Sequence, residues 1–74
     1  MSLDLRIDRQ SPVPLYHQLA VQIEQHIEDG TLKPGDWIET EVDLAHRLGL
    51  GRPTVRQALH ELVTKGLLMR HDGQ

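Results

Sequence analysis

The sequence predicts a mostly α-helical fold, with a three-helix core and a small, truncated β-hairpin. Three observations carry this prediction. Apolar residues recur at helical spacing in three stretches, a glycine follows each stretch, and Asp72-Gly73 is a hairpin-turn signal. We expect one domain with helices at 15–29, 41–48 and 52–65. The expected core consists of Leu19, Ile23, Ile27, Leu44, Leu48, Val55, Leu59 and Leu62.

An extended arm is predicted before the first helix. Leu3, Leu5 and Ile7 alternate with charged residues, which is the period of a strand. We expect this apolar edge to pack on its own domain or to pair with another chain. Pro12 and Pro14 then bar a helix before residue 15.

The second and third predicted helices have start and stop signals. Thr40 with Asp43 resembles a capping box, and Gly49 ends the helix that follows. Gly51 allows the next N-cap, and Pro53 sits in the first turn, where no amide donor is missed. The basic Lys65 and a glycine close this last helix.

A minimal sheet is expected beside the helices. The sequence predicts a strand at residues 67–71, and we expect residues near Met69 to pair with residues near Ile38. Because the hairpin-turn signal lies at residues 72–73 of 74, we expect this chain to lack the return strand. We expect the sheet to be weak, because short isolated pairings are marginal.

The composition excludes several classes of protein. There is no cysteine, which excludes disulfides and thiolate zinc sites and favours a cytoplasmic location. No apolar run approaches the roughly 20 residues that cross a bilayer, and the N-terminus is no signal peptide. The net charge of −3 is uneven: residues 1–45 carry three cations against nine acids, and residues 46–74 carry five against two. The second part can approach a polyanion.

Two short helices joined by a glycine-containing turn form a helix-turn-helix. Residues 52–65 are then the recognition helix. Arg52 and Arg56 lie one turn apart near its start, with Gln57 beside them. Arginine can donate two parallel hydrogen bonds to guanine and can also grip phosphates.

These residues have ordinary structural alternatives. Surface arginines on helices are common, and Arg56 can pair with an acid such as Glu61. Thr54 can bond a phosphate oxygen, or it can only cap its own helix. The local spacing of these residues fits both the DNA contacts and the structural roles.

The motifs taken together resemble GntR-family regulators over residues 12–74. The first is Pro14-Leu15-Tyr16-His17-Gln18, which looks like the HutC-type or YtrA-type branch. The stretch 30–36 and the segment Arg52-Pro53-Thr54-Val55-Arg56 stand at the family's spacing. The remaining matches are Thr40-Glu41, Leu44-Ala45, Leu48-Gly49, Ala58-Leu59, Leu62 and Lys65-Gly66-Leu67-Leu68.

The resemblance implies a bacterial transcription regulator, expected to be a repressor, that binds a palindromic operator as a dimer. It divides the chain into an arm at 1–13 and a winged helix-turn-helix at 14–74. It also implies a separate C-terminal domain, outside these residues, for a small-molecule effector. The DNA-binding residues that it implies are Arg52, Thr54, Arg56, Gln57, Thr40, Glu41, Arg70 and Gly73, with Thr54 on phosphate and Gly73 near the wing tip.

Three positions depart from the family's pattern. Family members usually carry a basic residue where Val42 stands, a proline where Glu39 stands, and a serine or threonine where Gly51 stands. We therefore assign no direct polar contact with DNA to Val42 or Gly51.

Two other functions fit the sequence less well than DNA binding. An enzyme is disfavoured because no two of the five histidines stand at i, i+4, and no catalytic triad or phosphate loop is evident. We expect no cofactor and no metal. A winged helix used only for protein contacts predicts an apolar surface around Arg52 and Arg56, where the sequence places cations instead.

Overall fold

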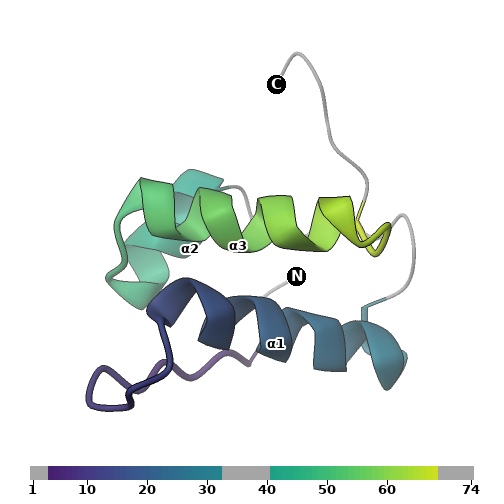
Figure 1. Ribbon diagram of the computed structural model, residues 1–74, viewed down its shortest axis with the longest axis horizontal. Coiled ribbons are helices and arrows are strands. Elements are labelled where there is room, and N and C mark those ends of the chain that lie inside the picture. Colours follow the sequence, from purple (N-terminus) through teal and green to yellow (C-terminus); the bar gives the residue numbers. More distant parts are fainter. Residues whose placement is uncertain (1–3, 33–40, 69–74) are drawn as a thin grey trace.

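Three helices form the described part of the molecule. The computed structural model describes residues 4–32 and 41–68, and it contains α1 (Leu15–Glu28), α2 (Glu41–Leu48) and α3 (Arg52–Thr64). In Figure 1, α1 and α3 lie side by side and run in the same direction, while α2 packs against α3. The three expected helices are confirmed, and α1 and α3 each end one residue earlier than predicted.

Left-handed glycines end the helices as the sequence indicates. Gly49 has a φ of 67° after α2, and Gly66 has a φ of 77° after α3. The following amide then bonds back to the last turn, from Leu50 N to Ala45 O at 3.0 Å and from Leu67 N to Leu62 O at 2.9 Å. This arrangement satisfies carbonyls that the helix leaves without partners. It also turns Leu50 back into the core, where it is buried.

The core lies between the helices and extends to the segments that join them. Five of the eight expected core residues are buried, and Ile27, Leu48 and Leu59 are half-buried against them. Core residues outside the expected set are either alanines on the inner helix faces or leucines outside the helices. The buried side chains are Leu5, Leu19, Ala20, Ile23, Leu32, Leu44, Ala45, Leu50, Val55, Ala58 and Leu62.

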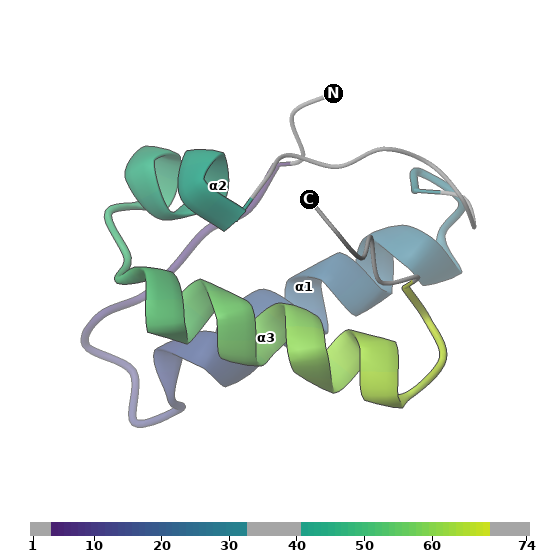
Figure 2. The same ribbon diagram turned by 90° about the horizontal axis from the view of Figure 1, so that it is seen from above.

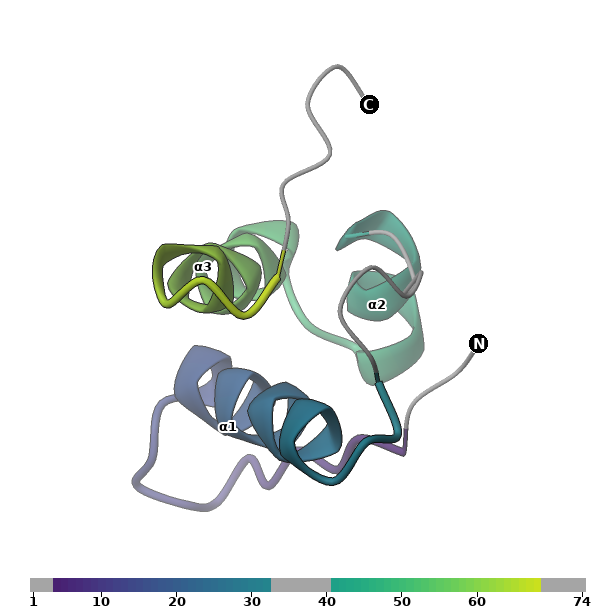
Figure 3. The same ribbon diagram turned by 90° about the vertical axis from the view of Figure 1, so that its right-hand side faces the viewer.

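The arm packs on its own domain, which is one of the two expected arrangements. Leu5 is buried and Ile7 is half-buried against the core. Figure 3 shows the arm passing beside α1. Leu3 lies outside the described residues.

Side chains of α1 hold the backbone of the arm. The Gln22 side chain accepts from Arg6 N at 2.7 Å and donates to Arg6 O. The Gln18 side chain accepts from Asp8 N at 2.8 Å and donates to Asp8 O at 2.9 Å. Four residues of helix rise about 6 Å, close to the reach of two extended residues, so the two periods match. Gln18 and Gln22 therefore replace a partner strand.

The expected sheet cannot be followed, because Ile38, Met69, Asp72 and Gly73 lie outside the described residues. Within the residues that are described, none of the helices has the length and apolar character needed to span a membrane.

Candidate nucleic-acid interface

The interface is built on α2, the turn at residues 49–51 and α3. Figure 2 shows α2 beside the N-terminal half of α3, with the short turn between them. Val55, Ala58 and Leu62 form the buried side of α3. Arg52, Arg56 and Gln57 lie on the exposed side of the same helix.

Arg52 and Arg56 meet at one carboxylate of α2. Arg56 donates from Nε to Glu41 Oε2 at 3.2 Å and from Nη2 to Glu41 Oε1 at 3.0 Å. Arg52 donates from Nε to Glu41 Oε1 at 3.3 Å. The arginine side chains are 60% and 61% exposed, whereas that of Glu41 is 24% exposed. The carboxylate is thus the inner partner, and the guanidinium groups face solvent.

The pairing also changes the acidity of these groups. Hydrogen bonding from Arg56 holds the pKa of the Glu41 carboxyl below its ordinary value of 4.5, and Arg52 adds a smaller effect in the same direction. The pKa of Arg56 is raised, chiefly by the same hydrogen bond. Glu41 and Arg56 are therefore both charged at neutral pH. Among residues 4–32 and 41–68, the bond that holds Arg52 uses only Nε, so its two terminal NH2 groups can donate to an outside acceptor.

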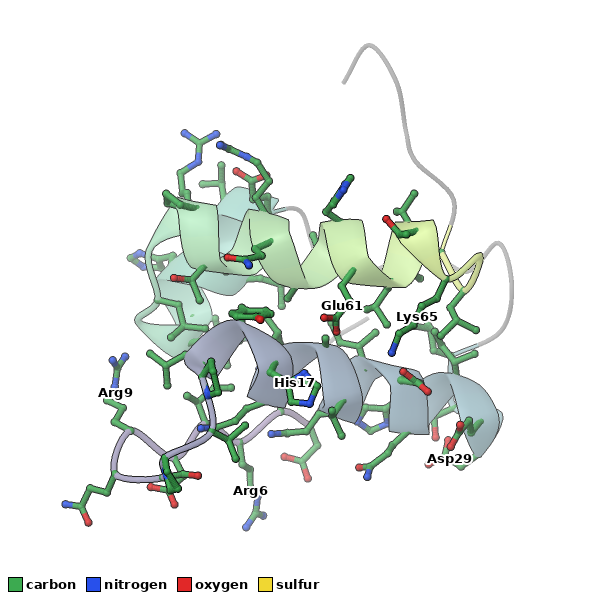
Figure 4. The ribbon with its side chains drawn as sticks, in the orientation of Figure 1. Arg6, Arg9, His17, Asp29, Glu61 and Lys65 are labelled. Atoms are coloured by element: carbon green, nitrogen blue, oxygen red, sulfur yellow. The ribbon has the colours of Figure 1, made fainter. Side chains whose placement is uncertain are left out.

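Glu61, the sequence alternative for a partner of Arg56, lies elsewhere. It faces α1, where its Oε2 is 3.8 Å from His17 Nδ1. A second contact joins Lys65 Nζ, at the C-terminal cap of α3, to Glu24 Oε1 of α1 at 3.3 Å. Figure 4 shows His17, Glu61 and Lys65 between α1 and α3. These pairs belong to the packing of α1 on α3.

The other predicted site residues are placed less closely together. Gln57 is exposed on α3, while Thr54 is half-buried and its amide bonds to Gly51 O at 3.1 Å. Gly51 caps α3 without a side-chain hydrogen bond. Thr40, Arg70 and Gly73 lie outside the described residues.

Sequence reasoning missed how Glu41 is used. It is separated from Arg52 by 11 residues and from Arg56 by 15, so no helical periodicity links them. Only the angle between α2 and α3 brings them together. The sequence signal that could have found it is an acid in the first turn of α2, opposite two cations in the first turns of α3.

Across residues 4–32 and 41–68, no three histidine, aspartate or glutamate side chains gather in a group that could hold a metal ion. The chemistry that this surface offers is hydrogen bonding and charge.

Comparison with known protein families decides the relationship. The profile of the bacterial regulatory proteins, gntR family, matches residues 15–74. The chain belongs to the GntR family. Its winged helix-turn-helix fold is shared with YtrA from Sulfolobus acidocaldarius, a GntR-family transcription factor, at a TM-score of 0.87 and 38% identity. That comparison covers 92% of this chain and 72% of YtrA.

The curated relatives of this chain are longer proteins. The transcriptional repressor NagR of Bacillus subtilis is 41% identical over 95% of this chain and 29% of its own length. The repressor MngR of Escherichia coli, of a mannosyl-D-glycerate transport and metabolism system, is 49% identical over 74% of this chain and 23% of its own length. The histidine utilization repressor of Klebsiella aerogenes is 37% identical over 88% of this chain and 27% of its own length. The chain therefore spans less than a third of these relatives.

Proposed function

We propose that this GntR-family chain is the DNA-reading head of a transcription regulator and that α3 enters the major groove. The observation that carries the proposal is the pair of exposed arginines at the start of α3, held by Glu41. In a helix-turn-helix, residues near the N-terminal end of the second helix contact base edges. Arg52 and Arg56 stand at this end.

The two arginines suit different contacts. Within the described part of the chain Arg52 is held only through Nε, and its two terminal NH2 groups suit two parallel bonds to guanine O6 and N7. Arg56 is held by two bonds, and its remaining donors suit a phosphate as well as a base. Gln57, on the same exposed side of α3, is the third proposed base contact, and Thr54 is proposed on phosphate.

Further contacts are proposed outside the described residues. Thr40, which precedes α2, would contact the DNA backbone. Arg70 and Gly73 would contact DNA from the wing. Glu41 acts mainly by placing the arginines. A carboxylate near phosphates is unfavourable by itself, and its pairing with two cations offsets that repulsion.

The whole protein is proposed to be a cytoplasmic dimer on a palindromic site. NagR, MngR and the histidine utilization repressor are named as repressors, and repression is the proposed outcome here. Residues 1–13 act as an arm and residues 14–74 as the reading head. An effector-binding domain would follow in the longer protein and control the distance between two heads.

A salt series on random duplex DNA tests DNA binding by the chain. For each phosphate contact, the slope of log K against log salt becomes steeper by about 0.9. We expect a steep slope for the wild type and a shallower one for the Arg52→Ala, Arg56→Ala double variant. Absent or salt-independent binding would favour a winged helix that contacts only proteins.

A further inference from the structure

Arg9 connects the arm to the turn of the helix-turn-helix. Its Nη2 donates to Leu48 O at 3.4 Å and also to Gly49 O, across 39 and 40 residues of sequence. Figure 4 shows the Arg9 side chain extending from the arm. These two carbonyls lie at the C-terminal end of α2, where a helix has carbonyls without partners and favours a nearby cation.

The backbone that carries Arg9 is itself fixed. Asp8 accepts from Ser11 N at its carbonyl, at 3.3 Å, and from Gln10 N at its carboxylate, at 2.9 Å, which closes a turn around Arg9. Gln18 of α1 then holds both backbone polar groups of Asp8. None of these bonds uses the Arg9 side chain. That side chain therefore starts from a backbone position that is fixed relative to α1.

The turn that Arg9 holds sets the direction of α3. It contains Gly49 and Gly51, whose backbones have more freedom than other residues. Leu50 anchors the turn from the core, where it is 7% exposed, and Arg9 anchors it from outside. A Cβ placed on Gly49 would lie 3.1 Å from Arg9 Nη2, so the guanidinium lies directly on this backbone. Arg52 follows only three residues later.

We infer that Arg9 is a positioning residue for DNA reading. By holding the carbonyls of Leu48 and Gly49, it fixes the direction in which α3 presents Arg52 and Arg56. It does so without contacting DNA. The inference rests on the proposed function, and it makes Arg9 matter for recognition of a specific site much more than for general attraction to phosphates.

The test compares Arg9→Gln and Arg9→Lys with the wild-type protein. Arg6→Gln is the matched control, because Arg6 is on the same arm, its side chain is 88% exposed, and it pairs with Asp4 at 3.6 Å. Affinity is measured for a duplex selected from random DNA by the wild type, and for random duplex across a salt series. The melting temperature is measured for each variant, and binding is assayed well below it.

Positioning predicts a specific combination of results. Arg9→Gln should lose about tenfold in affinity for the selected duplex, the size of a lost charge-assisted hydrogen bond, with less than about twofold change on random duplex and an unchanged salt slope. Arg9→Lys should recover most of the loss, since an ammonium can donate to the same carbonyls. Arg6→Gln should bind as the wild type does.

Three results would overturn the inference. One is unchanged affinity of Arg9→Gln for the selected duplex, even with a lower melting temperature, which indicates a role in stability alone. Another is an equal loss on both duplexes with a salt slope smaller by about 1, which indicates a phosphate contact. The third is unshifted amide resonances of Leu50 and Arg52 in folded Arg9→Gln. If the wild type itself selects no sequence, the proposed function fails instead, and the amide resonances still report on the Arg9 contact.

Discussion

Glu41 and Arg56 form a bidentate ion pair between α2 and α3, with N–O distances of 3.2 and 3.0 Å. Arg52 donates to the same carboxylate at 3.3 Å. One side chain of α2 thus places both cations of α3. Exposed ion pairs typically contribute at most about 1 kcal/mol to stability, so the main consequence of this pair is the geometry of the arginines.

Replacing Glu41 by Gln should lower the specificity of DNA binding. The arginines lose their common anchor, so affinity for a selected site should fall by about tenfold, the size of a lost charge-assisted hydrogen bond. Affinity for random duplex should stay level or rise, because one negative charge near the phosphates is removed. Filter binding measures the ratio of the affinity for the selected duplex to the affinity for random duplex. Glu28→Gln, which removes one negative charge from an exposed position of α1, is the control, and an equal ratio of the two affinities in both variants would argue against placement by Glu41.

The Glu41 pair should persist well into the acid range. The folded-state pKa of Glu41 lies below its ordinary value of 4.5, chiefly because Arg56 donates to it. The stabilisation is therefore fully present above pH 4.5 and is lost as the pH falls through the lowered pKa. A carbon-13 NMR titration of the Glu41 carboxyl measures this value. In Arg56→Gln the midpoint should move up toward 4.5, and a wild-type midpoint at or above 4.5 would contradict the pairing.

Releasing the arm should destabilise the domain. Gln22→Ala removes both hydrogen bonds to the Arg6 backbone, at a cost of about 1–2 kcal/mol in the free energy of unfolding. Gln25→Ala makes the same change at an exposed position of α1 and should have little effect. Urea denaturation gives the two free energies, and hydrogen exchange at the Arg6 amide reports local release. Equal stability of the two variants would show that the amide pairing contributes nothing.

Tethering two copies of the chain should raise the affinity for a palindromic site. A second head on a flexible linker acts at an effective concentration of order millimolar, which adds about 10²–10⁴ in avidity. A single copy should bind near the non-specific range of about 10⁻⁴–10⁻⁶ M at physiological salt. Isothermal titration of both forms measures the difference. Nanomolar binding by a monomeric single copy would mean that one head carries most of the binding energy.

The helices could be predicted from the sequence because their signals are local. Apolar residues at every third or fourth position define the buried faces of α1 and α3. Gly49 ends α2 and Gly66 ends α3, each by adopting a positive φ. Leu50 was missed because it follows the glycine and falls outside the helical period. A leucine just after a terminating glycine is itself a signal of a buried contact.

The site could be predicted only in part. Arg52 and Arg56 follow from their spacing and from the helix start, whereas their contact with Glu41 depends on how α2 crosses α3. The Arg9 contact with the turn joins residues about 40 positions apart, for which the sequence has no periodic signal. Whether the alternating arm paired with its own domain or with another chain was likewise open, and Gln18 and Gln22 of α1 resolve it.

The central claim, that α3 reads DNA through Arg52 and Arg56, is tested most directly by single substitutions on a selected site. Affinities of the wild type, Arg52→Ala and Arg56→Ala are measured on the selected and on random duplexes, with Arg6→Ala as the control. Arg52→Ala should cost about 1–3 kcal/mol on the selected site and much less on random duplex, while Arg56→Ala should weaken both. Equal binding by the wild type and the double variant on both duplexes would contradict the claim.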